Sequence, residues 1–314
     1  MKNIEISIVV PVYKEEEVIE EFYNKLVKVM EATKFSFEII FINDDYPDSS
    51  TMVVLKKICQ RDPRVLVIGF TRNFGHQIAL TAGIDYARGE AVIMLDSDLQ
   101  HPPDLIPDLI KAWKQGYDVV YTIRQDVLGE PALKKLFSKL FYLMMSKISD
   151  VDMGFNCADF RLISRKAADG FRKIRENTRF IRGLISWIGY KKTSLPFIAD
   201  QRYKGKSKYS LRKNLAFALD GVLSFSNFPI RLISFMGVLI SSISFIYILR
   251  VAYYVIFAKE AIPDWLPITT ITLFLSGIQM LMLGIIGEYV AKIFTETKNR
   301  PLYLLDKILG EERA

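Results

Sequence analysis

Several signatures are missing from this sequence, and each absence argues against a class of protein. Among 314 residues there are only two cysteines, Cys59 and Cys157. Their spacing fits neither a metal site nor a redox pair, so we expect free thiols. No Gly-x-Gly-x-x-Gly follows a predicted strand, which argues against a dinucleotide-binding site. Residues 205–207 (Gly-Lys-Ser) resemble the end of a phosphate-binding loop, but Asp200 stands where the first glycine of that loop should be.

Nucleic-acid recognition is also disfavoured, because the chain has no zinc-ligand spacing and no aromatic RNA-binding motif. The net charge of +7 therefore points to other anions, namely phosphates and lipid headgroups. The chain begins directly with a predicted strand, so we expect no signal peptide. We predict that the first part of the chain stays on the cytoplasmic side, where it is made.

Two long stretches contain no charged residue, 232–249 and 265–287. At ~1.5 Å rise per residue, each is long enough to cross a ~30 Å hydrocarbon layer as a helix. We predict two membrane spans, at about 231–257 and 265–290. A buried helical hairpin in a soluble protein is the alternative.

The charges beside these spans predict their orientation. Arg231 precedes the first span, and Lys292, Lys298 and Arg300 follow the second. Positive residues favour the cytoplasmic side, so both termini are predicted to be cytoplasmic in a multi-pass protein of the plasma (inner) membrane.

Four parts of the chain follow from these patterns. We predict a catalytic domain at 1–210, a juxtamembrane amphipathic helix at 211–229, a two-helix anchor at 230–293 and a cytoplasmic tail at 294–314. Leucines and aromatics alternate with lysines at helical spacing in 133–148 as well. Basic amphipathic helices of this kind lie at the headgroup level, so membrane lipids are expected partners; packing against the sheet is the alternative.

The first part of the chain alternates apolar runs with amphipathic stretches, which is typical of an α/β domain. Because the runs are continuous in apolar residues, they predict a mostly parallel, Rossmann-like sheet covered on both faces. The expected strands are 4–12, 37–43, 65–70, 91–95 and 118–122, and the expected helices are 15–33, 49–60, 75–87 and 103–115.

Acidic residues follow three of these strands. Asp96 and Asp98 close the strand at 91–95, Asp44 follows a second strand, and Glu15 follows the first. Carboxylates at a strand end suit Mg²⁺ or Mn²⁺, which can bridge to a diphosphate and neutralise a leaving group. Crowded carboxylates repel one another without a cation or ligand. We therefore expect a ligand site at the carboxyl ends of the strands.

Five motifs follow one another along the chain: Val-Val-Pro-Val-Tyr-Lys-Glu at 9–15, Phe-Ile-Asn-Asp at 41–44, Thr-Arg-Asn-Phe-Gly at 71–75, Asp-Ser-Asp-Leu-Gln at 96–100 and Asp-Phe-Arg-Leu at 159–162. In this order they resemble the GT-A polyisoprenyl-phosphate glycosyltransferases, the superfamily of dolichol-phosphate mannose synthase. Ser-Phe-Ser-Asn-Phe-Pro at 224–229 and Gly-Glu-Tyr at 287–289 resemble the bactoprenol glucosyltransferase branch. The resemblance covers nearly the whole chain.

The resemblance implies a GT-A fold and an inverting transfer of a hexose to polyisoprenyl (undecaprenyl) phosphate at the cytoplasmic membrane face. The default donor is UDP-glucose, and the product would be a lipid-linked sugar for the cell envelope. It also implies a Mg²⁺ or Mn²⁺ cofactor, oligomeric assembly and a separate flippase. The metal ligands would be Asp96 and Asp98. The implied donor-binding residues are Pro11, Tyr13, Glu15, Asp44, Arg72, Asp96 and Gln100.

The implied catalytic residues are Asp159, Asp98 and Arg202. A phosphate monoester has a second pKa near ~6 and is mostly dianionic at neutral pH. Asp159 is therefore expected to orient the acceptor or stabilise positive charge at the anomeric carbon, rather than to act as a base. The predicted ligands of the acceptor phosphate are Arg124, Arg202, Lys206, Ser207 and Lys208. We interpret His76 and His101 as structural residues.

The motifs that are present and absent also disfavour two other enzyme classes. A processive polysaccharide synthase is disfavoured because the chain has no Gln-x-x-Arg-Trp, and a nucleotidyltransferase because no glycine-rich loop with a lysine follows the first strand. The branch usually has Asp-Gly-Ser and Gly-Asp-Phe-Arg where this chain has Asp-Asp-Tyr at 44–46 and Ala-Asp-Phe-Arg at 158–161. The first departure motivates a further alternative, a catalytically inactive membrane scaffold that binds a nucleotide sugar.

Overall fold

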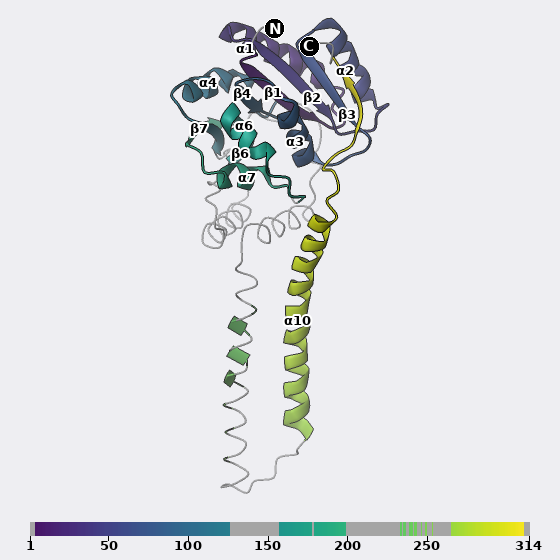
Figure 1. Cartoon of the computed structure of the whole chain (residues 1–314), viewed down its shortest axis with the longest axis vertical. Coiled ribbons are helices and arrows are strands. Elements are labelled where there is room, and N and C mark those ends of the chain that lie inside the picture. The colour runs from purple at the N-terminus through teal and green to yellow at the C-terminus, as the bar shows by residue number, and fades with distance from the viewer. Residues whose placement is uncertain are drawn as a thin grey trace. The chain divides into compact units, whose positions relative to one another are not determined.

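The computed structural model in Figure 1 describes residues 4–125, 157–198 apart from 178, scattered positions between 233 and 253, and 265–310. The chain divides into two compact units. The first comprises 1–147, 151–218 and 301–314, and the second comprises 148–150 and 219–300.

An eight-stranded sheet with the order β7-β5-β6-β4-β1-β2-β3-β8 forms the centre of the first unit. β1 pairs in parallel with β2 and with β4, and β2 pairs in parallel with β3. These four strands are fully buried, which explains their continuous apolar sequences. The strand bounds are β1 Ile6–Val12, β2 Phe37–Asn43, β3 Val65–Phe70, β4 Ala91–Met94, β5 Val119–Gln125, β6 Cys157–Ser164, β7 Lys192–Ile198 and β8 Leu305–Leu309.

Helices cover both faces of this sheet (Figure 1). The helix α1 buries Ile19, Phe22 and Leu26, at helical spacing, in a core shared with α2, α4 and the strands. The helix α3 contacts β1 and β2 from the opposite face, where a side chain on Gly83 would meet Val9. The helices are α1 Ile19–Thr33, α2 Ser50–Arg61, α3 His76–Tyr86, η1 Pro103–Leu105, α4 Ile106–Lys114, α6 Arg165–Arg172 and α7 Ile181–Trp187.

The sequence predicted this part of the fold well, and it missed three strands. All five predicted strands exist, and β2 and β3 have the predicted bounds. β6, β7 and β8 were not predicted. β6 is antiparallel to β4 and β5, while β7 extends the sheet beside β5. The mostly parallel α/β fold is therefore confirmed. The motifs did not reveal that β6 makes the sheet mixed by pairing antiparallel with β4 and β5.

The strand β8 comes from the segment predicted to be a cytoplasmic tail. It pairs antiparallel with β3, and the backbone N–H of Thr71 donates to the carbonyl of Leu304 at 3.1 Å. The ring of Tyr303 stacks on Phe70 with centroids 5.4 Å apart, and its hydroxyl donates to Asp85 at 2.9 Å. Residues that follow the second predicted span are thus an integral part of the first unit.

The second unit contains the helix α10, Trp265–Thr297. Within the described residues, its segment Phe274–Thr297 is long and apolar enough to cross a membrane by length and composition. Most of the other predicted span, 231–257, lies outside the described residues, as do the predicted interfacial segments 133–148 and 211–229. The structure therefore supports one predicted span and does not test the pair.

Candidate active site

The carboxyl ends of β1 and β4 meet at a topological switch point. From β1 the chain continues to β2 and β3 on one side, while β4 lies on the other side. Ligands of open α/β sheets bind at such a point. Glu15 follows β1 here, and residues 96–98 follow β4. Because β6 is antiparallel to β4, with Met94 opposite Arg161, its first residues lie at this same edge and bring Asp159 to it.

Hydrogen bonds between neighbouring strand ends hold the turn at 96–98. The hydroxyl of Ser97 donates to the carbonyl of Pro11 at 3.4 Å and also to the carboxylate of Glu15. The backbone N–H of Gln100 donates to Asp98 at 3.1 Å. Glu15 therefore supports the turn that carries Asp98, a contact that its predicted donor-binding role did not anticipate.

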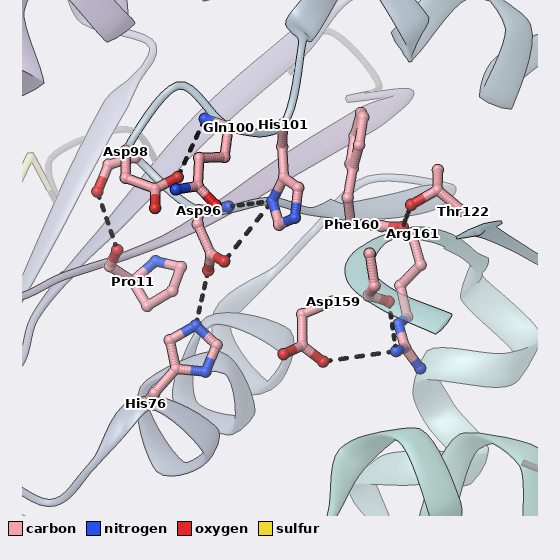
Figure 2. Close-up of polar contacts among 12 residues, drawn as sticks. Pro11, His76, Asp96, Asp98, Gln100, His101, Thr122, Asp159, Phe160 and Arg161 are labelled. Atoms are coloured by element: carbon pink, nitrogen blue, oxygen red, sulfur yellow. Dashed lines mark hydrogen bonds and ion pairs between the residues drawn. The ribbon is translucent and has the colours of Figure 1, made fainter. Parts of the chain in front are cut away.

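Asp96 lies beside two histidine rings (Figure 2). His76 Nε2 is 2.7 Å from Asp96 Oδ1, and the backbone N–H of Asp96 donates to His101 Nδ1 at 3.2 Å. Burial alone would lower the pKa of His76, but the charge of Asp96, with a smaller contribution from Asp159, raises it to about 9. His76 is therefore a cation at neutral pH. Both histidines lie at the candidate site and contact Asp96, and their predicted structural role stays a prediction.

Asp159 is held by a two-pronged ion pair. Arg182, in the first turn of α7, donates from Nε and Nη2 to the two carboxylate oxygens, at 2.8 Å each. Arg161 Nη2 lies 3.5 Å from Asp159 Oδ1 (Figure 2). Burial alone would raise the pKa of Asp159, but Arg182, then Arg161 and His76, hold it far below its ordinary value. Asp159 is thus a permanent anion in this arrangement.

A second loop at the same edge is organised by Asp44. Its carboxylate accepts from the backbone N–H groups of Phe74 and Gly75, at 2.6 and 2.9 Å, and from the Asn73 amide at 3.0 Å. Burial raises the pKa of Asp44 to about 6, although the two backbone hydrogen bonds act in the opposite direction. Since both oxygens already bind this loop, Asp44 orders residues 73–75. Its contact with a nucleobase stays a prediction.

Arg72 lies on the surface of that loop. Its guanidinium stands over the ring of Phe74 at 4.0 Å and donates to the carbonyl of Asn73 at 3.0 Å. The side chain is exposed beside the strand ends. Its contact with a diphosphate stays a prediction. Tyr13, partly buried, lies in the neighbouring loop after β1, with Lys14 over its ring.

The donor set of the turn fits a hard divalent cation. Two carboxylates, Asp96 and Asp98, are carried by one turn, and a diphosphate would add further oxygen ligands. Within the described residues, no cluster of three or more His, Cys, Asp or Glu side chains is placed to hold a metal by itself. Asp96 Oδ1 also accepts a hydrogen bond from His76 Nε2 at 2.7 Å. That Asp96 and Asp98 bind a divalent cation together with a diphosphate stays a prediction.

Most of the residues predicted to bind the acceptor phosphate lie outside the described part of the chain. Arg202, Lys206, Ser207 and Lys208 lie outside the described residues. The backbone of Arg124 lies near the carboxyl end of β5, opposite Phe197 of β7. Because Ile123 pairs with Cys157, this end of β5 lies beside the beginning of β6, which carries Asp159. Arg124 therefore shares the edge on which the site is built, as the prediction requires.

Among the described residues, Arg182 is the cationic group nearest to Asp159, and the sequence did not reveal this pair. A basic residue beginning a short amphipathic helix is a weak signal, and nothing in the spacing of 159 and 182 shows that they meet.

Ala158, which replaces the glycine usual in this branch, is part of β6 and is not among the described residues with a positive φ. Alanine can adopt this conformation without strain.

The order of the strands and the acidic edge define an open α/β sheet with a candidate ligand site at its switch point. The family model for glycosyl transferase family 2 matches residues 7–171, over half of the chain. The chain belongs to this family and is a glycosyltransferase.

Full-length relatives agree with this assignment. The chain is 44% identical to the uncharacterized glycosyltransferase YkcC of Bacillus subtilis, over 99% of this chain and 96% of that one. It is 37% identical to a prophage bactoprenol glucosyl transferase homolog of Escherichia coli, over 97% and 99% of the two chains. Among solved structures, S. aureus TarS in complex with UDP-GlcNAc matches with a TM-score of 0.47 at 16% identity, over 70% of this chain and 66% of that one.

Proposed function

We propose that this enzyme transfers glucose from UDP-glucose to undecaprenyl phosphate at the cytoplasmic face of the plasma membrane, with inversion. The observation that supports it most is Asp159, held as an anion at the same sheet edge as the Asp96–Asp98 turn. Full-length relatives carry the name bactoprenol glucosyl transferase. The apolar helix α10 supports a membrane location, which a lipid acceptor requires.

The chemistry follows from the charges. An oxygen of the dianionic acceptor phosphate attacks the anomeric carbon, the bond from that carbon to the diphosphate breaks, and the nucleoside diphosphate leaves. No proton has to be removed near pH 7, because the acceptor has already lost it. A buried carboxylate near the reacting carbon would stabilise the positive charge that develops there. Direct attack from the opposite side inverts the configuration.

A divalent cation would be held by Asp96 and Asp98 and would neutralise the charge of the departing diphosphate. Gln100 and Glu15 would support it by fixing the turn, through the contacts with Asp98 and Ser97. Arg72 and the loop ordered by Asp44 would bind the rest of the donor.

A screen of radiolabelled nucleotide sugars tests the proposal. Membranes containing the full chain and undecaprenyl phosphate are incubated with each donor, and the lipid product is extracted. We expect UDP-glucose to label the lipid, EDTA to abolish labelling, and Mg²⁺ or Mn²⁺ to restore it. Asp98→Asn should fold normally and lose activity. Full activity in EDTA would exclude the metal assignment. Labelling of the lipid from another nucleotide sugar, and not from UDP-glucose, would show that the enzyme transfers a different sugar.

A further inference from the structure

The pairing of Asp159 with Arg182 raises a problem that the proposed function does not solve. A carboxylate neutralised by a guanidinium through two hydrogen bonds of 2.8 Å has little charge left to stabilise an anomeric cation. Arg182 would have to move away for Asp159 to act. A guanidinium leaves a carboxylate readily only when another anion takes its place.

The acceptor phosphate is the anion that the reaction brings to this edge. Arginine binds phosphate in the same two-pronged way as it binds carboxylate, because its five N–H donors form a planar fork. The side chain of Arg182 is 30% exposed, whereas that of Asp159 beneath it is 13% exposed. Arg182 therefore stands on the solvent side of the pair, where an incoming phosphate would meet it first.

Asp159 would keep a cationic partner after such an exchange. Arg161 is only 3% exposed, so it cannot leave, and its Nη2 is already 3.5 Å from Asp159. Its buried Nε has no hydrogen-bond partner among the described residues. A buried donor without a partner is costly, and Asp159 lies within reach of the same guanidinium. Arg161 can thus hold the carboxylate ionised when Arg182 departs.

We propose that Arg182 is a ligand of the acceptor phosphate, which draws it from Asp159 and thereby frees the carboxylate for the reaction. The inference rests on the proposed function for the identity of the acceptor. It assigns Arg182 a role in substrate binding, which a residue that only positions Asp159 would not have. In this arrangement the carboxylate becomes active only when the acceptor is bound.

Binding without turnover tests this exchange. The full chain in detergent is titrated with geranyl phosphate by isothermal titration calorimetry, with no nucleotide sugar present. Geraniol serves as the neutral control for the prenyl tail. Arg182→Gln should weaken geranyl phosphate binding about tenfold or more, because a two-pronged charged contact is lost. Arg182→Lys should be intermediate, since it keeps the charge without the fork.

Asp159→Asn is the discriminating variant. If Arg182 must leave Asp159 to bind phosphate, removing the carboxylate charge should tighten geranyl phosphate binding severalfold, although it lowers turnover. Arg175→Gln is a matched control, because Arg175 makes a comparable pair with Asp85 at 2.9 Å and has no contact with Asp159 among the described residues. It should leave binding unchanged. Thermal unfolding of every variant shows that each has folded.

Several results would overturn the exchange: unchanged affinity in Arg182→Gln, unchanged or weaker affinity in Asp159→Asn, or no phosphate-dependent binding by the unaltered protein. Because no sugar is present, these outcomes are separate from failure of the proposed function. Binding that depends on Arg182, together with no transfer from UDP-glucose, would leave the exchange intact and refute only the donor.

Discussion

At the scale of single residues, Asp159 is the position where chemistry and environment are most tightly linked. Its carboxylate is enclosed by Arg182 from α7, Arg161 from β6 and His76 from α3, with the carboxylate of Asp96 nearby. Among the described residues, these cationic groups outweigh the neighbouring Asp96 anion, so they keep Asp159 deprotonated and hold its pKa far below its ordinary value. A group that never holds a proton near pH 7 is a poor proton acceptor in this reaction.

Asp159→Asn should therefore lose about 10²-fold or more in turnover, as is typical when one preorganised charge is removed. The ratio of wild-type to variant rates should stay constant from pH 6 to pH 8. The dianionic fraction of the acceptor rises across this range, but it rises equally for both proteins. Initial rates measured side by side at several pH values check this. Progressive recovery of the variant towards pH 8 would instead mean that Asp159 removes the proton of the acceptor.

At the scale of elements, β8 belongs to the catalytic sheet although the sequence patterns predicted this segment as a separate tail after the membrane anchor. The helix α10 ends at Thr297, and residues 298–304 lead directly into a strand of the catalytic sheet. The contact is specific at Tyr303, whose ring stacks on Phe70 and whose hydroxyl binds Asp85. Phe70 in turn packs edge-on against Phe74, with centroids 5.4 Å apart, in the loop ordered by Asp44. The C-terminal strand thus supports the predicted donor loop.

Tyr303→Ala should lower the free energy of unfolding of the first unit by roughly 2–4 kcal/mol, because a packed aromatic ring and a hydrogen bond are lost. Tyr303→Phe should cost only about 1 kcal/mol, since the ring remains. Leu304→Ala is a matched control, because that side chain is 54% exposed and its backbone carbonyl would keep the bond to Thr71. Thermal unfolding in detergent measures all three. Equal stability of Tyr303→Ala and Leu304→Ala would show that β8 contributes little.

At the scale of the whole molecule, connectivity limits the topology. The catalytic unit includes residues on both sides of the apolar region, up to 218 before it and from 301 after it. A chain that leaves this unit and returns to it must cross a membrane an even number of times. If α10 is one crossing, a second is needed between residues 218 and 265. The uncharged stretch at 232–249 is the segment long enough to provide it.

Both ends of the chain should therefore lie in the cytoplasm, with the short link between the spans outside. An enzymatic reporter fused after Ala314 should be inaccessible from outside intact cells, whereas a tag inserted between Lys259 and Asp264 should be accessible. Lys298 and Arg300 beside the end of α10 favour this orientation. Labelling with a membrane-impermeant reagent measures both. The reverse pattern would place the catalytic unit away from any nucleotide sugar and would refute the topology.

The sequence alone determined the half of the fold whose signals are local. Continuous apolar runs identified β1 to β4, since parallel strands are buried on both faces. The positions of Asp44, Asp96 and Asp98 after predicted strands also placed them at one edge of the sheet, because the carboxyl ends of parallel strands meet there. β6 and β7 were missed because their sequences, Cys-Ala-Asp-Phe-Arg-Leu-Ile-Ser and Lys-Thr-Ser-Leu-Pro-Phe-Ile, mix charged and polar residues with apolar ones. β8 is five residues long, and its pairing is set by contacts far away in the chain.

Only the tertiary structure decided which charges meet. Asp159 and Arg182 are 23 positions apart, and they pair because β6 runs antiparallel to β4 while α7 begins beside the start of β6. His76 and Asp96 meet because α3 begins at the same edge of the sheet at which β4 ends. Local sequence patterns report burial and backbone conformation over a few residues. The protonation state of a buried group depends on the distances to all charges around it, and those distances exist only once the chain has folded.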